Sequence, residues 1–536
     1  MANSIQLIIP MSGVGQRFIN AGYAEPKPLI PVDGFPIIRH VLAMFPGTTD
    51  VCFICNERHL GNTNMREVLK SLCPSAVIYS VPNENRRGPV DAVMQIAHAI
   101  SDDREVIVSY CDYGSTWDYP SFLNDVRTSN ADGAIACYTG FHPHMLGSDN
   151  YAFVQMDGNR AVRVQEKQPF TNNKMAELAS NGTYYFRSGL LLKKYFKQTL
   201  AEGPVVNNEY YCSVVYNHMI EDGLLVTAFE IDQMLQWGTP YDLEIYKGWS
   251  RYFSNIIRRQ PDIGVDGDTV TVLPMAGHGS RFSEKGYAVP KPFLDVNGAP
   301  MFIQAVKCLP PTRDNVFICL QNHLNQYNIG GDLSQQIEHY KVVPIGKTTQ
   351  GQACTCEIGV TEAAIDLDTP IMISACDNGV YYDTAKYHAL RENPDIDVIV
   401  WSFRNNQTSK VNPNMYSWLD VDADDNIRAV HCKNFVFDDP LKTHAIIGTM
   451  FFRKARYFMD GLQRNYAGNL RTNGEFYVDD VINRNIEQGL RVKVFEVENY
   501  ICWGTPDDYE TYQYWRKFFD GCDWHPYSIA LDTTSC

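Results

Sequence analysis

The sequence contains no long hydrophobic run, and its basic side chains are outnumbered by acidic ones. No apolar stretch approaches the roughly eighteen residues that a membrane-spanning helix needs, which argues against an integral membrane protein. Lys and Arg together number 46 against 62 Asp and Glu, so the formal net charge is −16. This balance argues against partners such as nucleic acid or an anionic membrane surface, while a few local cations can still hold a small anion.

The sequence also lacks a cationic segment before its first apolar residues, 1–10, which predicts that no signal peptide is present. The 15 cysteines are therefore expected to be reduced thiols of a cytoplasmic protein. One CxxC pair exists, Cys52 and Cys55, but no second pair follows to complete a zinc site. We interpret both thiols as structural.

An internal repeat organises the chain. The segment LIIPMSGVGQRF at 7–18 returns as VLPMAGHGSRF at 272–282, and AGYAEPKPLIPVDGFP at 21–36 returns as KGYAVPKPFLDVNGAP at 285–300. Matching positions are separated by 264 to 266 residues, and one extra residue falls in a predicted hairpin turn. A period of this length indicates two tandem domains rather than a solenoid. The boundaries that we expect are 1–260 for the first domain, 268–518 for the second, and 519–536 for a tail without a partner in the first copy.

Apolar runs alternate with helical patterns within each copy. Gln6–Ile9, Val51–Ile54 and Val106–Val108 are short apolar runs typical of strands, while Ile37–Phe45 carries apolar residues at helical spacing. The second copy repeats this pattern. The alternation predicts an α/β fold with βαβ units and a mostly parallel sheet, with ligands bound at the carboxyl ends of the strands.

A glycine loop with two cations follows the first strand of each copy. The residues concerned are Gly13, Gly15, Arg17 and Lys27 in the first copy, and Gly277, Gly279, Arg281 and Lys291 in the second. Glycines let backbone N–H groups approach an anion, and the cations add charge, so this pattern favours a phosphate site over a simple turn. The loop is not a P-loop, because GxxxxGK[ST] is absent, and Phe18 occupies the place of the third glycine of a dinucleotide fingerprint.

An acidic residue follows a buried strand in each copy, Asp112 in the first and Asp377 in the second. A carboxylate at the edge of a parallel sheet, facing a phosphate loop, suits Mg²⁺, although a turn-capping Asp is the plain alternative. Glu166 and Lys167 follow a later strand, where the second copy has Cys432 and Lys433. The lysines can neutralise a second phosphate and the glutamate can accept from an acceptor's hydroxyl or amine, although an edge-strand charge pair is also possible.

Two further motifs recur. Glu209 and Glu475 each open what reads as a helix, with an acidic group near its N-terminus. The motif Trp-Gly-Thr-Pro occupies 237–240 and returns at 503–506, each time before a helical pattern. Because Thr-Pro is good helix-start chemistry, we favour a structural role for this motif.

Together, GxGxRF, PKP, the strand-end Asp, Glu-Lys and WGTP resemble the nucleotidylyltransferases that make nucleotide sugars, particularly their capsule- and cell-surface-associated branch. The resemblance implies two tandem Rossmann-like nucleotidyltransferase domains, which bind a nucleoside triphosphate and a small phosphorylated acceptor and release pyrophosphate. In the first copy it implies triphosphate contacts from Gly13 and Gly15, catalytic Arg17 and Lys27, a base contact at Gly88, Mg²⁺ at Asp112, and acceptor contacts from Glu166, Lys167 and Glu209. In the second copy it implies Gly277, Gly279, Arg281, Lys291, Gly351, Asp377, Lys433 and Glu475 in the same roles.

The chain departs from the family pattern at three positions. Gln236 and Cys502 stand where many relatives have a second metal-binding Asp, and Cys432 replaces the glutamate of Glu-Lys. The sequence therefore leaves open two active halves of different specificity, or one active and one degenerate regulatory half. It also leaves the oligomeric state open, a homo-oligomer included.

Several functions agree with these patterns. The leading interpretation is transfer of a nucleoside monophosphate to a sugar 1-phosphate, and a close variant uses CTP with a non-sugar phosphate or phosphonate. A glycosyltransferase would need a DxD motif after a strand, and the one match, at 420–422, lies in the predicted hairpin. A nucleotide-sugar sensor or scaffold would bind without turnover.

Overall fold

The fold is described from a computed structural model that covers residues 5–83, 87–203, 205–258 and 266–532. The chain divides into two compact units, Met1–Lys247 and Gly248–Cys536. Within the described residues, every helix is too short or too polar to cross a lipid bilayer.

The division between the units falls inside helix α9 (Pro240–Ile256), ahead of the polar stretch with Pro and Gly at 258–268, where the sequence favours a domain linker. The last turns of α9 belong to the second unit because Phe253 packs its ring on Tyr512, with the centroids 6.0 Å apart. Residues 259–265 of the predicted linker lie outside the described residues.

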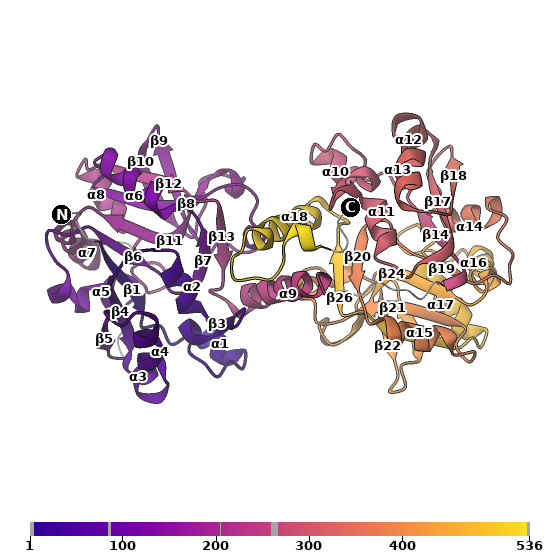
Figure 1. Cartoon of the computed structure of the whole chain (residues 1–536), viewed down its shortest axis with the longest axis horizontal. Helices are drawn as coiled ribbons and strands as arrows, with labels where there is room; N and C mark the ends of the chain where they lie inside the picture. Colours follow the sequence, from indigo (N-terminus) through magenta and orange to yellow (C-terminus); the bar gives the residue numbers. More distant parts are fainter. Residues whose placement is uncertain (1–4, 84–86, 204, 259–265, 533–536) are drawn as a thin grey trace. The chain divides into compact units, whose positions relative to one another are not determined.

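The first unit, coloured indigo to magenta in Figure 1, is built on one large sheet. The main path of the sheet is β5 (Val77–Val81), β4 (Asp50–Asn56), β1 (Gln6–Met11), β6 (Val106–Ser109), β11 (Leu178–Phe186), β8 (Gly133–Tyr138) and β12 (Val226–Glu230). The strands from β5 to β6 are parallel, and β11 runs antiparallel to both of its neighbours. A hairpin of β9 (Ala152–Asp157) and β10 (Arg160–Glu166) continues from β11.

The burial of the central strands explains their composition. All 6 residues of β1 are buried, as expected for a strand with both faces covered. Successive side chains point to opposite faces, so Ile8 and Val108 enter one core. The helices that close this core are α5 (Pro89–Gln95), α7 (Gly189–Glu202) and α8 (Val215–Glu221).

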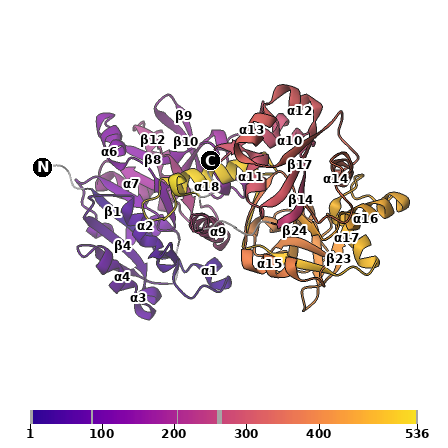
Figure 2. The ribbon, with the colours of Figure 1, turned by 45° about the vertical axis from the view of Figure 1, so that its right-hand side comes forward.

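The second unit repeats the same topology. Its sheet runs β18 (Tyr340–Ile345), β17 (Thr312–Leu320), β14 (Asp266–Pro274), β19 (Ile371–Ile373), β24 (His444–Phe452), β21 (Val398–Phe403) and β25 (Val492–Glu496). The hairpin of β22 (Trp418–Val421) and β23 (Ile427–His431) lies beside β24. Helices α14 (Gln352–Glu362), α16 (Ala455–Gly468) and α17 (Val478–Glu487) cover one face of the sheet, over a core that includes Val272 and Ile318 (Figure 2).

The predicted α/β fold class is confirmed: each unit is Rossmann-like, with a mixed sheet whose strands β5 to β6 in the first unit and β18 to β19 in the second are parallel. The predicted helix at Ile37–Phe45 is α2 (Ile37–Ala43), and the predicted hairpin turn joins β9 to β10. Cys52 and Cys55 are buried free thiols of β4, in agreement with a structural role.

One helix prediction is wrong in the first unit. The helix expected to open at Glu209 begins only at Val215. The reason is that the Tyr210 backbone is already paired: its N–H donates to the Arg87 carbonyl at 2.7 Å, and its carbonyl accepts from Val90 at 3.3 Å. In the second unit α17 begins directly after Tyr477.

The C-terminal segment after Phe519, as far as residue 532, packs within the second unit. His525 is buried, and its Nε2 lies 3.0 Å from the Ser250 carbonyl oxygen. The ring of Tyr527 packs on Phe253, with the centroids 4.6 Å apart. These contacts fasten the tail to the end of α9.

Candidate active site

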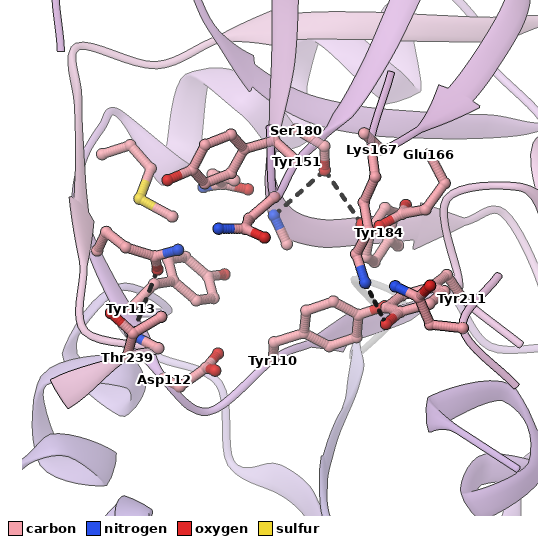
Figure 3. A pocket seen from close by; sticks show the side chains of 18 of the residues that line it. Tyr110, Asp112, Tyr113, Tyr151, Glu166, Lys167, Ser180, Tyr184, Tyr211 and Thr239 are labelled. Atoms are coloured by element: carbon pink, nitrogen blue, oxygen red, sulfur yellow. Dashed lines mark hydrogen bonds between the residues drawn. The ribbon is translucent and has the colours of Figure 1, made fainter. Parts of the chain in front are cut away.

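A polar cavity of about 410 Å³ opens at the edge of the first sheet where β6 ends. Asp112 and Thr239 lie on one side of it, while Glu166, Lys167 and Tyr211 lie on the other (Figure 3). The edge is the one that the βαβ pattern predicts for a ligand, because the carboxyl ends of parallel strands meet there.

The structure brings the loop lysine onto the strand-end aspartate. Lys27 lies in the short helix η1 (Lys27–Leu29), between two prolines that fix its backbone. Its Nζ donates to Asp112 Oδ2 at 2.7 Å and lies 3.5 Å from the Gly238 carbonyl. Arg17, in helix α1 (Gln16–Asn20), reaches the same cavity. A cluster of two cations and one carboxylate therefore forms from segments far apart in the sequence.

The second unit contains the same pair. Lys291 Nζ donates to Asp377 Oδ2 at 2.6 Å. Burial alone would raise the pKa of Asp377, but Lys291 and Arg281 outweigh it and hold that pKa below its usual range. Burial likewise opposes the charge of Lys291, yet the pKa of this lysine is raised, chiefly by Asp377. Both partners are thus charged.

The residues around each aspartate fit a Mg²⁺ ion that shares one protein carboxylate with phosphate oxygens, which is a usual arrangement for this ion. A Cβ on Gly238 would lie 3.0 Å from Asp112 Oδ2, and one on Gly504 would lie 3.1 Å from Asp377 Oδ2. The two glycines therefore leave each carboxylate accessible. Among the residues that the structure describes, no group of three or more His, Cys, Asp or Glu side chains could hold a metal by itself.

Uncharged groups occupy the position of the second metal-binding Asp. Gln236 Oε1 accepts weakly from the Gly238 N–H at 3.4 Å. Cys502 Sγ lies 3.3 Å from the Gly504 nitrogen, and burial raises the pKa of this thiol, which keeps it protonated. Any metal here would depend on a single protein carboxylate in each unit.

The other side of the cavity carries a hydrogen-bonded chain of ionisable groups. Ser213 Oγ donates to Glu166 Oε2 at 2.5 Å, and burial raises the pKa of Glu166. Lys167 Nζ donates to the Tyr211 hydroxyl at 2.7 Å, and this hydroxyl donates to Glu209 Oε2 at 2.8 Å. Lys167 adopts a left-handed backbone conformation with φ 58°, as does Lys433 with φ 50°.

The predicted base loop packs against the segment that carries Glu209. Gly88 has φ 100°, and a Cβ there would lie 2.8 Å from both the nitrogen and the carbonyl oxygen of Tyr210. Gly351 has φ 140° and makes the same close approach to Phe476. Each glycine is therefore required by the closeness of two backbones.

The structure gathers some of the predicted site residues and not others. Arg17, Asp112, Glu166 and Lys167 line the cavity, and Lys27 joins them through Asp112. Of the described residues, those predicted for the first site but outside the cavity lining are Gly13, Gly15, Lys27, Gly88 and Glu209.

The predicted acceptor residues of the second unit are arranged differently. Lys433 Nζ donates to the Met415 carbonyl at 2.6 Å rather than to a tyrosine. Glu475, in contrast, is exposed like Glu209, and its backbone pairs with Thr472 as that of Glu209 pairs with Val206. The glycines of the loop keep their places: Gly279 precedes helix α10 (Ser280–Glu284), and Gly277 has open space around it.

The sequence analysis missed most of the cavity's polar lining. The additional residues are Tyr110, Tyr151, Ser180, Asn181 and Tyr184. Comparison of the two copies detects only residues that recur in both. Four of these residues do not recur: Tyr110, Ser180, Asn181 and Tyr184 correspond to Ala375, Ile446, Ile447 and Met450. To predict that Tyr184 lies opposite β6, one would have needed to know that β11 pairs with β6.

Two buried histidines make the first unit sensitive to acid. His142 and His144 lie in the segment that leads to Tyr151 of the cavity, and burial lowers the pKa of His142 to about 4 and that of His144 further. Between pH 6.5 and 4 the unfolded chain binds a proton at position 142 that the folded chain does not. The free energy of unfolding should therefore fall by about 3 kcal/mol as the pH is lowered through this interval.

Urea unfolding at pH 7, 5.5 and 4.5 measures this effect. His142→Gln should weaken the pH dependence and leave the part that His144 contributes, whereas His278→Gln, at an exposed position, should leave it unchanged. An identical pH dependence in wild type and His142→Gln would contradict the assignment.

The fold and the site define a class of protein. A doubly wound sheet with a glycine loop, a Lys–Asp pair at its carboxyl edge and a polar cavity beside them is an arrangement that can hold a phosphorylated ligand. Residues 7–226 match the family model described as nucleotidyl transferase, which spans most of the first unit and less than half of the chain. Over these residues the chain is similar to the nucleotidyl transferase family.

Similar solved structures each align with less than half of this chain. A nucleoside-diphosphate-sugar pyrophosphorylase from Vibrio cholerae RC9 is 20% identical, with 45% of this chain and 98% of that chain covered and a TM-score of 0.37. The inositol-1-phosphate CTP transferase from T. maritima is 15% identical, with 48% and 98% covered and a TM-score of 0.37. A UDP-glucose pyrophosphorylase from Acinetobacter baumannii is 16% identical, with 47% and 94% covered and a TM-score of 0.37. No curated protein matches the chain.

Proposed function

We propose that the first unit transfers a nucleoside monophosphate from a nucleoside triphosphate to a sugar 1-phosphate and releases pyrophosphate. The observation that carries this proposal is the two-sided cavity. One side has the cations Lys27 and Arg17 with Asp112, and the rest is lined by hydroxyl and amide groups such as those of Ser180 and Asn181. A sugar phosphate offers the matching hydroxyl groups and negative charge.

The proposed reaction needs positioning and charge neutralisation rather than a protein nucleophile. A phosphate oxygen of the acceptor forms a bond to the α-phosphorus. The bond from the α-phosphorus to the oxygen that bridges it to the β-phosphorus breaks, and pyrophosphate leaves with the electron pair. One phosphoanhydride replaces another, so the reaction is expected to be freely reversible.

The residues take the following roles in this proposal. Gly13 and Gly15 let the triphosphate approach the backbone, while Arg17 and Lys27 neutralise its oxygens. Asp112 would hold Mg²⁺, which when bound withdraws charge from the triphosphate. In the second unit the equivalent residues are Gly277, Gly279, Arg281, Lys291 and Asp377.

The other side of the cavity would receive the acceptor. Glu166 and Lys167 face it, and Glu209 holds Lys167 in place through the Tyr211 hydroxyl. Gly88 lets the base-binding loop lie close to this segment. In the second unit Lys433, Glu475 and Gly351 stand at the matching positions. The cysteine-rich composition, with free thiols at the described positions, supports the cytoplasm as the site of the reaction.

Pyrophosphate release from the purified chain with Mg²⁺ tests the proposal. Each of the four common nucleoside triphosphates is combined with sugar 1-phosphates and with non-sugar phosphates and phosphonates. Release with one triphosphate and a sugar 1-phosphate is the expected result. Release only with CTP and a non-sugar acceptor would replace it with the cytidylyltransferase alternative, and nucleotide binding without any release would favour a sensor.

A further inference from the structure

In both units the acceptor side of the site is built on the same framework, a hairpin bonded to the helix beside it. In the first unit the Asn217 side chain bonds both backbone groups of Val164, at 2.9 and 2.9 Å. In the second unit the Asn483 side chain bonds both backbone groups of Val430, at 2.8 and 2.9 Å. The helix and the hairpin are therefore fixed to each other alike, and matched positions on them can be compared directly.

Three matched positions on this framework have changed together. They are Ala152, Glu166 and Ser213 in the first unit, and Ser417, Cys432 and Asp479 in the second. In the first unit Ser213 Oγ donates to the Glu166 carboxylate at 2.5 Å. In the second unit Ser417 Oγ donates to the Asp479 carboxylate and lies 3.5 Å from Cys432 Sγ. Each cluster thus keeps one carboxylate bonded to one hydroxyl, but the carboxylate of the second unit stands at the position of Ser213 and its hydroxyl at the position of Ala152.

The carboxylate of the second unit has moved from the hairpin to the first turn of α17. Asp479 is only 7% exposed, and burying a carboxylate is unfavourable unless it is hydrogen-bonded. Cys432 is shorter than the glutamate at the matching position, so it leaves space beside the hydroxyl. If the second unit had no use for a negative group here, losing the glutamate would have required no replacement.

Several positions of the matched cavity have become apolar, while the Lys–Asp pair of the phosphate side is kept. The pairing of Met450 with Ile373 matches that of Tyr184 with Val108, so positions along β24 and β11 correspond. The cavity residues Tyr110, Ser180, Tyr184 and Gln236 correspond to Ala375, Ile446, Met450 and Cys502. The Lys291–Asp377 pair nevertheless keeps a distance of 2.6 Å.

We propose that the second unit is a second transfer site for a different acceptor: a phosphorylated compound poor in hydroxyl groups, which offers one ammonium or hydrogen-bond donor to Asp479. This inference rests on the proposed function of the first unit. Asp479 is assigned as the specificity-determining residue, because its carboxylate is bonded to Ser417 in the cluster that matches Glu166 and Ser213, while several hydrogen-bonding partners of a sugar have been lost.

The test measures pyrophosphate release with each unit silenced in turn. Lys27→Ala leaves only the second site, and Lys291→Ala leaves only the first. The probes are glucose 1-phosphate, inositol 1-phosphate and O-phosphoethanolamine with each nucleoside triphosphate. We expect Lys27→Ala to retain turnover of O-phosphoethanolamine and Lys291→Ala to retain turnover of a sugar or inositol phosphate.

Asp479→Asn then tests the assigned residue. In the Lys27→Ala background it should raise the KM for the acceptor by about ten-fold or more and leave the KM for the nucleotide within about two-fold, as expected for loss of a charged hydrogen bond. Glu166→Gln is the matched variant in the Lys291→Ala background. A rescue variant combines S417A, C432E and D479S, which installs the first unit's cluster in the second and should restore acceptor binding relative to D479S alone.

The outcomes separate the two proposals. No pyrophosphate from wild type with any pair overturns the function proposed for the first unit, and this inference with it. Turnover in Lys291→Ala but none in Lys27→Ala overturns only the second site. Use of the same acceptor with equal KM by both silenced variants overturns the proposed difference in specificity. An unchanged acceptor KM in Asp479→Asn overturns the role of that side chain.

Discussion

Lys27→Ala is expected to lower the turnover of the first unit by roughly 10²–10³-fold. Its ammonium lies 2.7 Å from Asp112 Oδ2 at the side of the cavity where the triphosphate is proposed to bind. Without this cation the charge of the triphosphate and of the departing pyrophosphate is less well neutralised. Steady-state pyrophosphate release in the Lys291→Ala background, with and without the second substitution, measures the loss.

The stability of the protein should change little in Lys27→Ala. The side chains of Lys27 and Asp112 are 19% and 26% exposed, and ion pairs with this access to solvent contribute modestly to folding. Lys197→Ala, at an exposed position of α7, is the control and should retain full turnover. Undiminished activity in Lys27→Ala would remove this lysine from the catalytic machinery and with it the proposed triphosphate site.

Gly88→Ala is expected to destabilise the first unit by roughly 3 kcal/mol or more. Two costs combine at this position. The backbone has φ 100° and ψ −176°, a region that essentially only glycine populates. The new Cβ would also meet the Tyr210 backbone at 2.8 Å, and backbone cannot turn aside as a flexible side chain can. Urea unfolding measures the loss of stability, and nucleotide titration measures the accompanying loss of binding.

Gly22→Ala separates these two costs. Gly22 has φ 87°, but a Cβ there would have nothing within 4 Å, so only the backbone strain applies. Its expected cost is about 1 kcal/mol. Equal destabilisation by the two variants would show that the contact with Tyr210 is unimportant.

The arrangement of strands and loops could be predicted from the sequence because its motifs occur twice in the chain. The recurrence of Gly15, Lys27 and Asp112 about 264 residues later distinguished them from chance turns and surface charges. The buried runs around Val51 and Val106 identified parallel strands, since nothing else explains short, wholly apolar segments between helical patterns. The structure confirms these elements.

The rest depended on contacts between distant segments. Lys27 and Asp112 are 85 residues apart, and their pairing follows from the closure of the sheet rather than from any local pattern. The antiparallel strand β11, which brings Tyr184 to the cavity, has a different sequence in each copy. The exchange of Glu166 for Asp479 looked from the sequence like the loss of a carboxylate, because residues on different elements had to be superposed before it could be seen as a relocation.

The two units share a left-handed lysine at the end of the hairpin. Lys167 and Lys433 keep φ values of 58° and 50°, where a glycine would be more stable by about 1 kcal/mol. Their immediate neighbours, Glu166 and Cys432, have diverged. Each unit therefore keeps one amine at the end of its hairpin at a small loss of stability.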